Sequence, residues 1–300
     1  MATVEQTGVV IPRQSPIVRR RRLAATLRRL RAHTGLTAGE AARRIERDAS
    51  WLSRIENADV RPHPHDVRAL LGLYGVAGEQ AEAVLTVARQ ARLRGWWQRY
   101  SDVLPDWFAT YVGLEFEAAT IRTYACQAVP SLLQTEQYAR ATLRGIPAPR
   151  STEEVERLVA LRLKRQDILG GADPPQLRVV VDEGAIRRVV GGAPTMRDQI
   201  RKLIERSESP NIEVRMLPFT AGPTVDGSFV ILDIPPLPEP YPDVVEDRTV
   251  YIDALTAALW VDRPADVEWY AAAHDQLEAK SLPPDATRDA LRRIAINLPA

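Results

Sequence analysis

Hydroxyl-bearing and cationic side chains gather in one short stretch of this sequence, at spacings that place them on one side of a helix. Ser50, Ser53 and Arg54 are its central members, and Ala49 and Trp51 accompany them. Hydroxyl and guanidinium groups near the start of a helix are suited to hydrogen bonds with nucleic-acid base edges and phosphates. The stretch therefore predicts a surface suited to DNA.

The elements that position this surface are two short helices joined by a tight bend. Thr37 and Glu40 form the pattern of a capping box, which predicts the start of the first helix. Asp48 is predicted to cap the second helix with its carboxylate. Leu52 and Ile55 then supply the buried side of that helix. Two helices in this arrangement match a helix-turn-helix, which seats its second helix in the DNA major groove.

Helical periodicity continues on both sides of the motif. Upstream, apolar residues recur at helical spacing over residues 17–30, and arginines fill most other positions. Downstream, Pro62 and Pro64 precede another periodic stretch, and a further one covers residues 79–94. The sequence thus predicts an all-helical DNA-binding domain over residues 17–94.

The charge of the chain is unevenly distributed. Residues 1–100 hold 18 basic and 9 acidic side chains, whereas residues 101–300 hold 22 basic and 30 acidic ones. A basic region attracts DNA phosphates independently of base sequence. We expect Arg19 to Arg22 and Arg61 to hold the DNA backbone. The full set of residues predicted to contact DNA is Arg19, Arg20, Arg21, Arg22, Thr37, Ala38, Asp48, Ala49, Ser50, Trp51, Ser53, Arg54 and Arg61.

Residues 23–76 resemble the Xre family of bacterial repressors, the lambda-repressor and Cro type. The resemblance rests on the segments LRRLRAHTGLTAGEAARRI, WLSRIENADVRP and DVRALLGLYGV. It implies a helix-turn-helix transcriptional regulator. Two positions depart from the family pattern: Ala38 replaces a phosphate-binding glutamine, and Glu46 replaces the glycine at the bend. A non-glycine residue at a positive φ costs about 1 kcal/mol.

A disordered arm (residues 1–16) is predicted to precede this domain, and an aromatic-rich connector (residues 95–110) is predicted to follow it. Large aromatic side chains bury much surface, so we expect those of the connector to join the DNA-binding part to the rest of the chain. The alternative is that they line a ligand pocket or a groove for a partner. The aromatic residues are Trp96, Trp97, Tyr100, Trp107 and Phe108.

The remaining residues, 111–300, mix strand and helix patterns. Together with the first domain they predict an α+β chain, in which an N-terminal all-α domain precedes a larger mixed α/β regulatory or interaction domain. The predicted strands cover residues 120–129, 177–181, 212–217, 229–234 and 250–252, and the predicted helices cover residues 134–144, 151–169, 196–207, 264–280 and 284–297.

The second part also resembles a known group. It is similar to the C-terminal domain of uncharacterised function in WhiJ-like, Xre-type regulators of filamentous bacteria. The segments that carry the likeness are RGWWQRYSDVLPDWFATYVGLEFEA, IRTYACQAVPSLLQTEQYARA, VDEGAIRRVVGG, MLPFTAG and VYIDALTAALWVD. The resemblance implies a regulator often encoded beside a small partner protein in an antitoxin-like pairing. Ser131 departs from the glycine that is common at its position.

No residues in the sequence predict an enzyme. His63 and His65 lack a third metal ligand at a suitable spacing, so we expect no metal. Asp182 and Glu183 follow an apolar strand, and we expect them to cap the next helix. Cys126 is the only cysteine and is expected to be an inert thiol. We therefore expect no catalytic residues and no cofactor.

Two functions of different classes remain open. The first is a sequence-specific DNA-binding regulator, a homodimer on a palindromic operator whose second domain senses a small effector or a partner protein. The second is an antitoxin-like interaction module whose main partner is a small protein. The chain has no apolar run of membrane-spanning length, so we expect no membrane association and a cytoplasmic, nucleoid-associated location.

Overall fold

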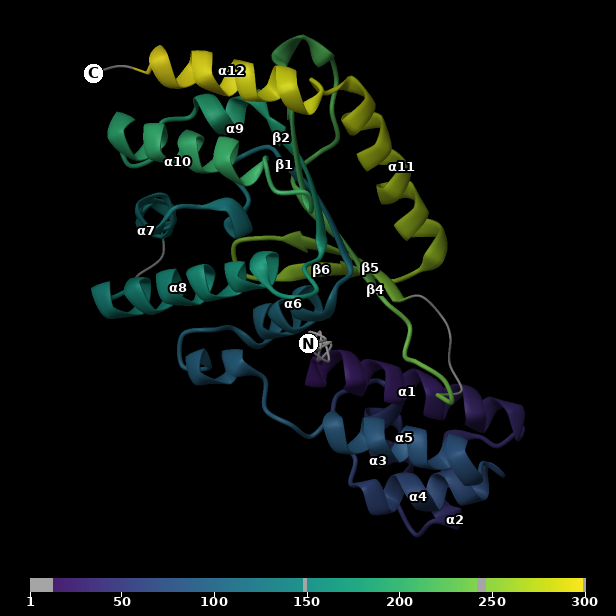
Figure 1. Cartoon of the computed structure of the whole chain (residues 1–300). Helices are drawn as coiled ribbons and strands as arrows, with labels where there is room; N and C mark the ends of the chain where they lie inside the picture. The colour runs from purple at the N-terminus through teal and green to yellow at the C-terminus, as the bar shows by residue number, and fades with distance from the viewer. Residues whose placement is uncertain (1–12, 148–149, 242–246, 299–300) are drawn as a thin grey trace, which may run out of the picture.

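The structure is a computed structural model, and it describes residues 13–147, 150–241 and 247–298. A small helical bundle is followed by a larger domain built on a mixed β-sheet (Figure 1). This arrangement confirms the predicted fold class. In the described part of the chain, none of the helices combines the length and the apolarity needed to cross a bilayer.

The bundle places its apolar side chains inward from every helix. Leu27, Leu52 and Leu70 are fully buried, and Tyr241, from the connection after β4, packs against the same core. Apolar burial of this kind is the main stabilising contribution to a small helical domain. The bundle helices are α1 (Pro16–His33), α2 (Ala38–Arg44), α3 (Ala49–Glu56), α4 (Pro64–Leu73) and α5 (Gly78–Gln90).

The second domain contains a six-stranded sheet in the order β3-β2-β1-β4-β5-β6. Strands β1, β2 and β3 run parallel, and β4, β5 and β6 add to them as antiparallel neighbours. The strands are β1 (Thr120–Ala125), β2 (Gln176–Asp182), β3 (Ile212–Leu217), β4 (Phe229–Ile234), β5 (Asp247–Asp253) and β6 (Ala258–Val261).

Helices cover both faces of the sheet (Figure 1). Val179 and Val181 face the larger core with α6, α8 and α10, whereas Val180 faces α11, as the two-residue period of a strand requires. The helices of this domain are α6 (Asp106–Glu117), α7 (Glu136–Gly145), α8 (Thr152–Arg165), α9 (Glu183–Arg187), α10 (Ala193–Arg206), α11 (Pro264–Lys280) and α12 (Pro284–Ile296), with short 3₁₀ turns η1 (Trp96–Tyr100), η2 (Ser131–Leu133), η3 (Gln166–Gly170) and η4 (Phe219–Ala221).

Two elements, α6 and β6, are absent from the sequence prediction, and the strand predicted over residues 120–129 ends at Ala125. Helix α6 begins at Asp106, inside the stretch expected to be a connector, and β6 was not predicted. Helix α6 buries Tyr111, Val112, Leu114 and Glu115, on several sides of its axis, so its sequence shows little amphipathic periodicity. Strand β6 is a short edge strand whose residues are half-buried or exposed, which leaves a weak pattern.

Helix α1 links the two domains. Val18 belongs to the core of the second domain, while Leu23 and Leu27 belong to the core of the bundle. The predicted arm lies mostly outside the described residues. Its described end is attached rather than free, because Arg13 donates to the Ala118 carbonyl (3.0 Å). The two domains are thus packed along α1 (Figure 1).

Candidate nucleic-acid interface

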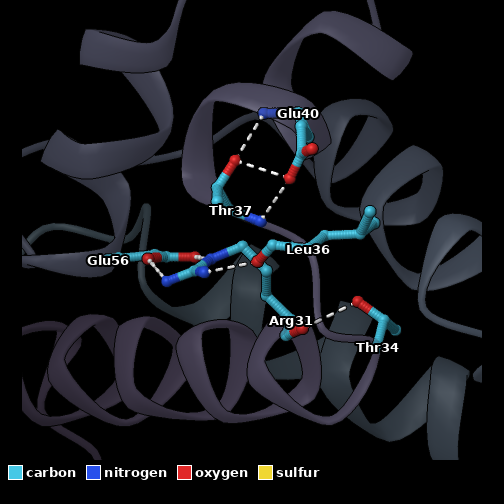
Figure 2. A network of polar contacts seen from close by, with 6 residues as sticks. All are labelled: Arg31, Thr34, Leu36, Thr37, Glu40 and Glu56. Atoms are coloured by element: carbon cyan, nitrogen blue, oxygen red, sulfur yellow. Dashed lines mark hydrogen bonds and ion pairs between the residues drawn. The ribbon is translucent and has the colours of Figure 1, made fainter.

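The start of α2 has the capping box that the sequence predicts. The Thr37 hydroxyl accepts a hydrogen bond from the Glu40 amide (3.2 Å), and the Glu40 carboxylate accepts one from the Thr37 amide (2.9 Å) (Figure 2). The Thr37 hydroxyl also donates to that carboxylate (2.7 Å). These hydrogen bonds lower the pKa of Glu40. Helix α2 therefore has a fixed first turn.

A second network fixes the end of α3. Arg31 donates from Nε to Glu56 Oε1 (2.7 Å) and from Nη2 to Glu56 Oε2 (2.9 Å). Its Nη1 donates to the Leu36 carbonyl (2.7 Å), so one guanidinium joins α1, α3 and the segment before α2 (Figure 2). The hydrogen bonds with Glu56 raise the pKa of Arg31. Bidentate pairs of this kind are among the stronger polar contacts in proteins.

Helix α3 divides into a buried and an exposed side. Leu52 and Ile55 lie in the bundle core, whereas Ser50, Ser53 and Arg54 are exposed. The other predicted contact residues of the motif are placed as follows: Thr37 and Ala49 are exposed, Ala38 and Trp51 are half-buried, and Trp51 lies under the guanidinium of Arg47. The exposed side leaves hydroxyl and guanidinium groups free to face another molecule.

The prediction for the cap of α3 needs a correction. Asp48 occupies the N-cap position, but its side chain makes no capping hydrogen bond. It is exposed at the start of α3. Nearby, Arg47 donates to Asp66 (2.8 Å), which ties the segment before α3 to α4.

The prediction that Arg19 and Arg22 hold the DNA backbone is wrong. Their exposed fractions are 5% and 8%, and both face the second domain. Arg19 pairs with the buried carboxylate of Glu117, and Arg22 donates to the carbonyls of Ile234 and Pro235. A buried guanidinium with such partners joins the domains and cannot reach phosphates.

The three other arginines that were predicted to contact the DNA backbone are at least partly exposed. Arg20 and Arg21 are half-buried, and Arg21 pairs with Asp262 across the domain boundary (3.0 Å). Arg61 is exposed in the segment between α3 and α4. Arg20 and Arg61 both line a cavity between the two domains.

Glu46 stands at the bend with a φ of 57°. Replacing it with glycine is expected to raise the free energy of unfolding by about 0.5–1 kcal/mol, because glycine adopts this conformation without steric cost. Urea denaturation measures the change. The matched control is Ala69→Gly within α4, which should lower stability by about 1 kcal/mol. Destabilisation by Glu46→Gly would contradict the assigned strain.

The aromatic residues after α5 lie in the core of the second domain. Trp97 and Tyr100 are buried there beside Val18 of α1, and Trp107 and Phe108 pack against the same cluster. Trp96 packs against this cluster too, and Trp96 and Trp97 both line a cavity between the domains. The structure thus places the aromatic stretch both at the domain junction and beside a pocket.

One group of potential metal ligands was not anticipated from the sequence. His274, Asp275 and Glu278 on α11 place ligand atoms within 4.8 Å of one another. The one-residue and four-residue spacings in HDQLE are the signal that sequence reading missed. Arg122 lies 3.8 Å from Asp275, and Arg215 lies 3.6 Å from Glu278. These guanidinium groups already balance the carboxylates and disfavour a cation.

Two family models match the chain. Residues 22–84 match a helix-turn-helix domain, and residues 108–293 match a domain of unknown function (DUF5753). The first match spans α2 and α3 and confirms the predicted helix-turn-helix. A search of curated proteins and a search of solved structures each returned no match. Because residues 108–293 are more than half of the 300, the chain belongs to the family of proteins that carry this domain of unknown function, here preceded by a helix-turn-helix domain.

Proposed function

We propose that this protein is a sequence-specific DNA-binding transcriptional regulator of the Xre, WhiJ-like type. The observation that carries the proposal is the exposed side of α3, with Ser50, Ser53 and Arg54 presented by a helix whose other side is buried. The Arg31 and Glu56 pair fixes the orientation of that helix. A recognition helix needs both properties, because base contacts require side chains held at defined positions in the major groove.

The proposed assembly is a homodimer on a palindromic operator. Two recognition helices would then enter successive major grooves, about 34 Å apart. Backbone attraction comes from the basic first 100 residues. The second domain is proposed to sense a small effector or a partner protein. In this proposal a change in the second domain is transmitted to the helix-turn-helix domain through α1, because side chains of α1 are packed into both cores.

Arg54→Ala is expected to weaken binding to the operator by about 1–3 kcal/mol, or roughly 5- to 150-fold, through the loss of one base or phosphate contact. Gel shifts with DNA from upstream of the protein's own gene measure the effect at physiological salt. The matched control is Arg68→Ala, an exposed arginine of α4 that pairs with Glu82.

Two outcomes of this experiment would contradict different parts of the proposal. Unchanged binding by Arg54→Ala would refute the assignment of Arg54. Equal binding of operator and random DNA by the wild-type protein would refute the regulator proposal. It would favour the alternative of an antitoxin-like interaction protein.

A further inference from the structure

A cavity of about 990 Å³ lies between the helix-turn-helix domain and the second domain. Its first wall is formed by Arg20 of α1 and by Arg61, which follows α3. Its second wall is formed by Arg94, Trp96 and the first turns of α6. A second hollow, of about 730 Å³, continues along α1 and shares Arg20 with the first. Cavities of several hundred Å³ are the size that small ligands occupy.

Four arginines line the cavity, and one of them, Arg99, donates to the Tyr100 hydroxyl (3.1 Å). Within the described residues, the side chains of Arg20, Arg61 and Arg94 make no ion pair and no hydrogen bond. Elsewhere many exposed arginines do pair with carboxylates, as Arg201 does with Asp198. An unpaired guanidinium beside a cavity is a ready site for an anion.

The carboxylates of the cavity do not neutralise these arginines by direct pairing. Asp59 and Asp106 line the cavity, and neither forms an ion pair within the described part of the chain. In the adjoining hollow, Glu56 is held by Arg31 and Asp262 by Arg21. The cavity wall therefore carries more positive than negative charge.

Arg20 is the most constrained of the three cations. Its Nε is buried and has no hydrogen-bond partner among the described residues. Burial lowers the pKa of Arg20, the nearby charge of Arg61 lowers it further, and Asp59 acts in the opposite direction. An anion placed between Arg20 and Arg61 would relieve the repulsion between them and supply the missing acceptor.

Trp96 gives the cavity a fixed aromatic wall. Its ring meets Trp97 edge-on at 5.9 Å and Tyr100 at 6.4 Å between centroids. Both partners are buried in the core of the second domain, so the Trp96 ring has little freedom to move. A rigid ring beside cationic groups suits a ligand that joins a planar ring to an anionic group.

We propose that this interdomain cavity binds a phosphorylated small molecule with a planar ring, the chemistry of a nucleotide. Its phosphates lie against Arg20, Arg61 and Arg94, and its ring lies against Trp96. The cavity reaches Ala58 and Asp59, directly after α3, so occupancy acts on the end of that helix. The effect of the ligand on α3 rests on the proposed DNA-binding function, but the binding of the ligand to the cavity does not.

Isothermal titration of the full-length protein tests the site at physiological salt, with ATP, GTP, inorganic triphosphate and adenosine as probes. We expect saturable binding of at least one nucleotide, weaker binding of triphosphate, and no binding of adenosine. Arg94→Gln should weaken nucleotide and triphosphate binding on the order of tenfold. Trp96→Leu should weaken the nucleotide only. The matched control, Arg89→Gln on α5, should bind as the wild type does.

Several results would overturn the inference. These are the absence of saturable binding of ATP, GTP and triphosphate, or undiminished nucleotide binding by both Arg94→Gln and Trp96→Leu. Operator binding without nucleotide should be unchanged in both variants. If both lose operator affinity instead, the cavity belongs to the DNA surface and the inference fails. Titration without DNA keeps this test separate, because nucleotide binding remains measurable even if no operator is found.

Discussion

Arg165→Met is expected to lower the free energy of unfolding of the second domain by about 3–5 kcal/mol. Arg165 is 2% exposed and donates two hydrogen bonds to Glu115, at 2.7 and 2.6 Å. Tyr111 donates to the same carboxylate (2.8 Å), and the rings of Phe108 and Tyr111 lie 5.2 Å from the guanidinium. Removing the arginine leaves Glu115 as a buried charge without its cation. Urea denaturation followed by circular dichroism measures the loss.

The double variant Arg165→Met with Glu115→Gln is the test of that mechanism. It removes the unpaired charge and keeps an acceptor for Tyr111, so it should recover at least half of the lost stability. The matched control is Arg201→Met, which breaks an exposed pair with Asp198 and should cost less than about 1 kcal/mol. A double variant as unstable as Arg165→Met would show that packing, rather than charge, dominates at this position.

Acidification from pH 7 to pH 4 is expected to remove about 3 kcal/mol of stability through His274 alone. The pKa of His274 is lowered from 6.5 to about 4, first by burial and next by Arg122, with Arg178 adding to the effect and Asp275 opposing it. A backbone hydrogen bond with Thr123 also opposes the shift, and the Glu278 carboxylate lies 3.8 Å from Nδ1.

The direction of this pH effect on stability follows from the lowered pKa of His274. Above pH 6.5 the imidazole is neutral in both states, and its contribution to stability is fully present. As the pH falls from 6.5 towards 4, the unfolded chain binds a proton that the folded chain resists, and the contribution is lost. Unfolding free energies measured across this range should therefore fall less steeply for His274→Leu than for the wild type.

Exposed His65 supplies the matched control for this measurement. His65→Leu should retain the pH dependence of the wild-type protein, because it leaves the buried imidazole of His274 in place. If His274→Leu retains it as well, the buried imidazole is not the group that destabilises the folded state in acid.

The capping box and the bend of the motif were predictable from sequence because they depend on near neighbours, although the predicted cap by the Asp48 side chain is absent. The capping box joins Thr37 and Glu40, three residues apart, and the positive φ of Glu46 follows from the glycine expected at the bend. The assignment of Arg19 and Arg22 to DNA failed because it depends on distant partners. Glu117 lies 98 residues from Arg19, and nothing in an arginine run reveals such a partner.

The arginine run therefore has two sides that the sequence alone does not separate. Arg19 and Arg22 join the domains, whereas Arg20 lines the cavity between them. Helical periodicity places these positions on a common helix, but only the packed second domain determines which face is covered. The same limit applied to α6, whose burial on several sides leaves little periodic signal.

Selection from a pool of random double-stranded DNA tests the central claim, that α3 reads base sequence. At physiological salt, the purified wild-type protein should enrich a single motif, and an inverted repeat is expected if the protein binds as a dimer. Arg54→Ala should relax the preference at one position within each half-site. Recovery of DNA with no enriched motif over the starting pool would contradict the account.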